Sequence, residues 1–68
     1  MPLIHVTLLS GRSEEEITAL GRALTEAVHT TLGTPREAIR VTVDECRPGH
    51  WFVGGASMAE RKKETRGG

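Results

Sequence analysis

Cysteine and metal-ligand patterns are scarce in this sequence. Cys46 is the one cysteine among 68 residues, so the chain cannot form an internal disulfide. The three histidines, His5, His29 and His50, lie far apart, and together with Cys46 they match no zinc-binding spacing. We therefore expect a protein that uses neither a disulfide nor a metal.

An excess of charge and long apolar stretches are missing as well. Nine basic and nine acidic side chains give a formal net charge of zero, whereas a nucleic-acid-binding module normally carries a basic excess. No apolar run approaches the roughly 18 residues that a membrane span needs. The apolar run near the N-terminus is short and lacks a basic start, unlike a signal peptide. We expect a cytoplasmic protein with no nucleic-acid or membrane partner.

The length of the chain limits how it can be stabilised. Residues 1–68 suffice for a single domain, and a domain this small buries little of its surface. Small domains commonly rely on disulfides, a metal or association. With the first two excluded, the sequence predicts a homo-oligomer that buries apolar surface between copies.

A strand and a long helix are predicted in the first half. Leu3–Leu9 has the composition of a strand, apolar on both faces apart from His5 and Thr7, which suits a strand buried on both faces. Ser13 and Glu16 fit a helix-starting capping box. Apolar residues then follow at spacings of three or four: Ile17, Leu20, Leu24, Val28 and Leu32. Gly33 is well placed to end this helix.

The residue pattern in the second half of the sequence predicts another strand and a short hairpin. Ile39–Cys46 alternates between apolar and polar residues with a period of two. Trp51–Gly55 is a short apolar segment that ends in glycines, and residues 57–68 suggest a frayed polar tail. We predict an α+β fold with one β-α-β unit, parallel strands and a right-handed crossover. Because two strands do not form a stable sheet alone, this fold again requires other copies.

Three residues are candidates for chemistry. If Met1 is removed, Pro2 becomes an N-terminal secondary amine, which is a base held by a ring at the start of a strand. Arg12 and Arg40 each stand outside any run of charges. Taken singly, an arginine of this kind is usually a solvated surface residue. Abstraction of a proton beside a carbonyl creates an enolate, however, and a guanidinium can stabilise that charge. Burial and nearby cations also lower the pKa of an amine, which keeps the base neutral.

A wider set of residues accompanies them: Pro2, the turn Leu9–Ser13, Arg40, the run Gly49–Trp51 and the pair Gly54–Gly55. In this set and at these spacings the chain resembles the 4-oxalocrotonate tautomerase family of small β-α-β enzymes, up to about Gly55. Trp51 stands where the best-known members carry phenylalanine, and Phe52 stands where they often carry glycine. These differences bear on the substrate more than on the proton chemistry.

The resemblance implies both a mechanism and an assembly. Pro2 would be the general base that moves a proton between carbons of an unsaturated 2-oxo acid such as 2-hydroxymuconate, through a dienol. Of Arg12 and Arg40, one would bind a substrate carboxylate and the other would polarise the 2-oxo group, with Arg40 reaching in from a neighbouring subunit. Leu9 and Trp51 would contact the substrate. The family assembles as a hexamer, a trimer of dimers, without a cofactor.

Two other functions remain open from the sequence. The same scaffold could support hydration-type dehalogenation or decarboxylation of a small acid, which needs an acidic residue to activate water. Asp44 and Glu45 are the candidates for that residue. Alternatively, the chain could be a homo-oligomeric module without catalysis, in which case a blocked Pro2 would not matter.

Overall fold

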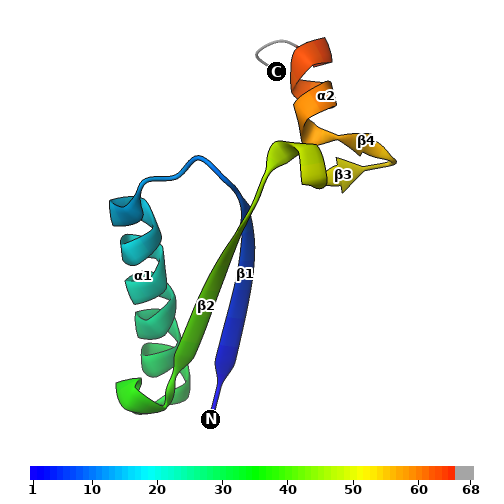
Figure 1. Ribbon diagram of the computed structural model, residues 1–68. Helices are drawn as coiled ribbons and strands as arrows, with labels where there is room; N and C mark the ends of the chain where they lie inside the picture. The colour runs from blue at the N-terminus through cyan, green and yellow to red at the C-terminus, as the bar shows by residue number, and fades with distance from the viewer. Residues whose placement is uncertain (66–68) are drawn as a thin grey trace.

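The computed structural model describes residues 1–65, with side chains as far as Arg61. Its elements follow in the order β1 (Leu3–Leu9), α1 (Glu14–Leu32), η1 (Arg36–Ala38), β2 (Arg40–Cys46), η2 (Pro48–His50), β3 (Phe52–Val53), β4 (Ala56–Ser57) and α2 (Met58–Thr65). Strands β1 and β2 lie side by side with α1 across one face, and η2, β3, β4 and α2 lie beyond the end of β2 (Figure 1). The predicted β-α-β unit and C-terminal hairpin are confirmed.

Strands β1 and β2 are parallel, and their register runs from Leu3 opposite Arg40 to Leu9 opposite Cys46. In β1, alternate residues Ile4, Val6 and Leu8 are half-buried. The other face of the strand is more open, and Leu3 is 65% exposed. Within a single copy this strand is not buried on both faces, because none of the described residues covers the face of the sheet opposite α1.

Helix α1 begins and ends as its sequence predicts. The Ser13 hydroxyl accepts a hydrogen bond from the Glu16 N–H at 3.1 Å, and the Glu16 carboxylate accepts one from the Ser13 N–H at 3.0 Å. This reciprocal pair satisfies two N–H groups that have no partner in the first helical turn. Gly33 ends the helix in the left-handed conformation with φ 72°, where its N–H bonds to the carbonyl of His29.

The segment after β4 differs from its prediction. Residues Met58–Thr65 form the eight-residue helix α2, so the prediction of a frayed tail is wrong there. The physical reason is a second capping box, in which Ser57 and Glu60 exchange the same two hydrogen bonds at 3.2 and 2.9 Å. Ser57 is buried. The rest of the predicted tail, residues 66–68, lies outside the described residues.

A single copy of the chain has almost no core. Ile39 is the only buried apolar residue among those described, and no described side chain is fully buried. The radius of gyration is 15.5 Å, whereas a compact chain of this length would have about 11 Å. The hairpin and α2 extend beyond the sheet instead of folding back on it (Figure 1). The shape and the exposed apolar surface are those of a subunit.

Candidate active site

Pro2 and Arg40 lie together at the edge of the sheet where both parallel strands begin. The backbone N–H of Arg40 donates to the carbonyl of Pro2 at 3.0 Å, which ties Pro2 to the sheet. The guanidinium of Arg40 is exposed, and its Nη1 donates to the carbonyl of Glu37 at 2.7 Å. Met1 is joined to Pro2 here, so the Pro2 nitrogen is a tertiary amide and cannot accept a proton.

Arg12, Leu9 and Trp51 lie at the opposite edge, where the strands end. Leu9 is the last residue of β1, and Arg12 lies exposed in the loop that follows it. The N–H of Ser10 donates to the carbonyl of Cys46 at 2.9 Å, so this loop adjoins the chain leaving β2. Trp51 follows on that chain and is half-buried, and its carbonyl accepts from the Met58 N–H at 2.7 Å.

The structure therefore brings the predicted site residues together in two groups, not one. From Leu3 to Leu9 the strand advances six steps of about 3.3 Å, so the two edges are roughly 20 Å apart. Within one copy, Arg12 and Trp51 cannot meet Pro2 across that distance over a small acid. A site that uses both groups must combine the starting edge of one copy with the finishing edge of another.

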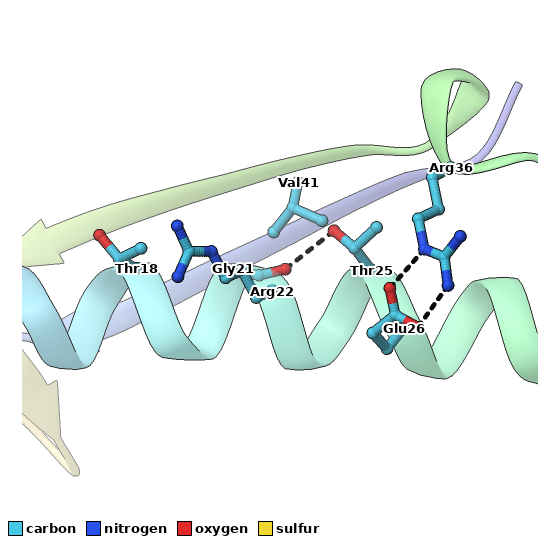
Figure 2. A pocket seen from close by; sticks show the side chains of 7 residues that line it. All are labelled: Thr18, Gly21, Arg22, Thr25, Glu26, Arg36 and Val41. Carbon is cyan, nitrogen blue, oxygen red and sulfur yellow. Dashed lines mark hydrogen bonds and ion pairs between the residues drawn. The ribbon is translucent and has the colours of Figure 1, made fainter.

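Several grooves border α1, and two of them adjoin the sheet. The smaller of these two, about 280 Å³, is lined by Leu8, Arg12, Glu16, Ile17 and Leu20 and so contains one predicted site residue. The larger, about 550 Å³, lies between α1 and β2 and contains none of them (Figure 2).

An ion pair closes one end of the larger groove. Arg36 donates from Nε and Nη2 to the two carboxylate oxygens of Glu26 at 2.6 and 3.0 Å (Figure 2). These hydrogen bonds from Arg36 hold the pKa of Glu26 below its ordinary 4.5, and the same bonds raise the pKa of Arg36.

The exposed face of the sheet carries a polar cluster that sequence reasoning missed. His5 Nδ1 lies 2.8 Å from the Thr42 hydroxyl, and His5 Nε2 lies 3.2 Å from an Asp44 oxygen. The cluster forms because the register places His5 opposite Thr42, and neighbouring residues of one face can then touch. Asp44 is thus engaged with His5 on the sheet face, away from Pro2. This arrangement gives no support to Asp44 as the residue that activates water.

The described residues contain neither a membrane-crossing helix nor a cluster suited to a metal ion. Among residues 1–65, no helix is both long enough and apolar enough to cross a membrane. Among residues 1–61, whose side chains are described, His, Cys, Asp and Glu do not gather in groups of three that could hold a metal ion.

Comparison with known proteins places this geometry in a family. The model of the family described as "Tautomerase enzyme" matches residues 2–61. A probable tautomerase from Ralstonia nicotianae is 46% identical over 66 residues, which cover 97% of this chain and 94% of that protein. A probable tautomerase from Staphylococcus epidermidis is 43% identical over 61 residues, covering 90% of this chain and 100% of that protein.

Solved structures agree with the sequence matches. TomN, a 4-oxalocrotonate tautomerase homologue in the tomaymycin biosynthetic pathway, superposes with a TM-score of 0.89 at 64% identity, covering 91% of this chain and 95% of that one. A heterohexamer 4-oxalocrotonate tautomerase from Chloroflexus aurantiacus gives a TM-score of 0.83 at 43% identity, covering 88% and 97%. The chain therefore belongs to the tautomerase family, among the homologues of 4-oxalocrotonate tautomerase.

Proposed function

We propose that this protein is a cofactor-independent tautomerase that acts on unsaturated 2-oxo or 2-hydroxy dienoic acids of the 2-hydroxymuconate type. Its general base is Pro2, once Met1 has been removed. One observation carries the proposal: the Pro2 carbonyl accepts from the backbone N–H of Arg40 at 3.0 Å, so the proline is held at the sheet edge where the strand that carries Arg40 begins. Enolate chemistry requires a positioned base and a cation that can stabilise the developing charge.

The reaction is a transfer of one proton within the substrate. The neutral amine of Pro2 takes the proton of the 2-hydroxyl group, which leaves a dienolate and a protonated proline. The ammonium then returns the proton to a carbon of the conjugated chain, and the free amine is restored. Arg40 stabilises the negative charge on the dienolate oxygen and the adjacent carboxylate, an interaction that strengthens as the charge develops.

The second group of residues comes from another copy of the chain. Arg12 binds the carboxylate at the far end of the substrate as a charge-assisted pair, and Leu9 and Trp51 supply apolar walls. In this arrangement Arg12 and Arg40 of one site belong to neighbouring subunits. The roughly 20 Å between the two sheet edges of one copy supports a site shared between copies.

The assembly we propose is a homohexamer, a trimer of dimers. The nearly absent core and the extended shape of one copy support association. One relative of known structure is a heterohexamer. Sedimentation at micromolar concentration tests this proposal, because a stable, folded monomer of 7.4 kDa would contradict it.

Ketonisation assays test the function itself. Protein that lacks Met1 should accelerate the ketonisation of 2-hydroxymuconate, which is measured as the loss of the dienol absorbance. Shorter enols serve as alternative substrates in the same assay. The 64% identity to TomN favours a biosynthetic setting, so enols beyond those of aromatic degradation belong in the screen. An assembled, processed protein that accelerates none of them would refute the proposal.

A further inference from the structure

Arg47 lies, like Arg12, at the edge of the sheet where the strands end, and it takes no part in the mechanism proposed for Pro2, Arg12 and Arg40. It follows β2 directly, and its loop adjoins that of Arg12 because the Ser10 N–H bonds to the carbonyl of Cys46 at 2.9 Å. The β-α-β topology thus places two guanidinium groups on neighbouring loops at one edge.

The backbone of Arg47 is fixed at the start of the single turn η2. Its carbonyl accepts from the His50 N–H at 2.8 Å, and Pro48 stands at the first position of the turn, where its ring fixes φ. Trp51 ends the same turn. At about 2 Å of rise per residue, Arg47 and Trp51 are about 8 Å apart. If Trp51 forms a wall of the pocket, Arg47 lies at its rim.

The charge of Arg47 is not neutralised within the described chain. Its Nη2 lies 3.4 Å from Nε2 of His50. A guanidinium can only donate, so the His50 nitrogen is the acceptor in this pair and supplies no negative charge. Among residues 1–61 no carboxylate pairs with Arg47, whereas Arg36 is paired with Glu26 in bidentate fashion. The Arg47 side chain is exposed and its charge is available to an anion.

We propose that Arg47 is a specificity residue that acts with Arg12 on the far carboxylate, so that the site prefers dicarboxylates to monocarboxylates. The location of that carboxylate rests on the proposed function. His50 steers the guanidinium through its 3.4 Å contact. Arg47 binds substrate in this role but takes no part in proton transfer, so its removal affects affinity and not the chemical step.

A matched pair of unreactive ligands isolates this role. Muconate and sorbate share one six-carbon diene, and they differ in carrying a carboxylate or a methyl group at the far end. Calorimetric titration of the assembled wild-type protein should show a preference for muconate. Arg47→Gln should weaken muconate binding about fivefold, the strength of an exposed charge pair, and leave sorbate binding unchanged. Arg47→Lys should keep part of the preference, because charge remains but the bidentate geometry is lost.

Arg22→Gln is the matched control for lost charge. Arg22 is an exposed arginine in the middle of α1, away from the finishing edge of the sheet. The control should keep the muconate preference of the wild type. An equal loss in Arg22→Gln would show a general charge effect and overturn the assignment. Equal weakening of both ligands by Arg47→Gln, no weakening at all, or loss of assembly would also overturn it.

Kinetics with reactive substrates separate this inference from the proposed function. Arg47→Gln should raise KM for 2-hydroxymuconate with kcat nearly unchanged, and it should spare the monocarboxylate 2-hydroxy-2,4-pentadienoate. A wild-type protein that prefers muconate but ketonises neither dienol would contradict the proposed function alone. An active wild type whose substrate preference does not depend on Arg47 would contradict this inference alone.

Discussion

Mixing two impaired variants should raise kcat/KM above that of either variant alone if Arg12 and Arg40 of one site come from different copies. The perturbation is co-expression of Arg12→Ala chains with Arg40→Ala chains, so that the two assort at random within one oligomer. Each variant assembled alone lacks one arginine in every site. In mixed oligomers, some sites draw Arg12 from one intact chain and Arg40 from another.

The expected magnitude follows from the geometry. Arg40 starts β2, whereas Arg12 follows the end of β1, and the intervening six register steps cover about 20 Å. Because the two arginines of one chain start this far apart, we propose that each site takes them from different chains. With equal amounts of the two chains, a site has an even chance of receiving each intact arginine, so about one quarter of sites are complete. The mixture should recover about one quarter of wild-type kcat/KM per site.

The assay is 2-hydroxymuconate ketonisation by purified mixed oligomers, with chain ratios measured by mass spectrometry. The control replaces the Arg40→Ala chain by a chain with both substitutions, because no site can then contain Arg12. That control should stay at the background of the single variants. If the complementary mixture also stays at background, one chain supplies both arginines to each site, and the two-edge argument is refuted.

Three further predictions concern single residues. Arg40→Ala should lower kcat/KM about 10²-fold or more, as loss of a group that stabilises developing charge does. Arg12→Ala should raise KM more than it lowers kcat. Steady-state kinetics on assembled protein test both substitutions, and neutral effects of Arg12→Ala and Arg40→Ala together would contradict the site. Glu26 has a pKa below its ordinary 4.5 in the folded chain. At pH values around and below 4.5, native protein therefore binds fewer protons than unfolded protein, and the free energy of unfolding falls as the pH drops. Glu26→Gln should flatten this part of the stability–pH curve from denaturant titrations, and an unchanged slope would contradict the Arg36 pairing.

Local chemistry made most of the fold predictable from the sequence. Ser13 and Glu16 mark the start of α1, Gly33 marks its end, and alternation over Ile39–Cys46 marks β2. Helix α2 was missed because its charged residues resemble a solvated tail. Ser57 and Glu60 nevertheless repeat the spacing of the first capping box, and that signal could have revealed the helix.

The site was less predictable because register and assembly are not local. A parallel pair places Pro2 and Arg40 at one edge by topology alone, so that part of the grouping follows from the strand order. The pairing of His5 with Thr42 depends on the register, which short apolar strands do not specify. Which copy supplies Arg12 depends on surfaces that one chain leaves exposed.

The central claim is that the amine of Pro2 is the base, and one comparison tests it most directly. Protein with Met1 retained and protein with Met1 removed are prepared, their intact masses are verified, and their rates of 2-hydroxymuconate ketonisation are measured under the same conditions. An amide nitrogen is not a base, so the form with Met1 should be nearly inactive. The processed form should be active, and Pro2→Ala, which keeps an N-terminal amine without the ring, should be slower but measurable. Full activity with Met1 attached would contradict the mechanism.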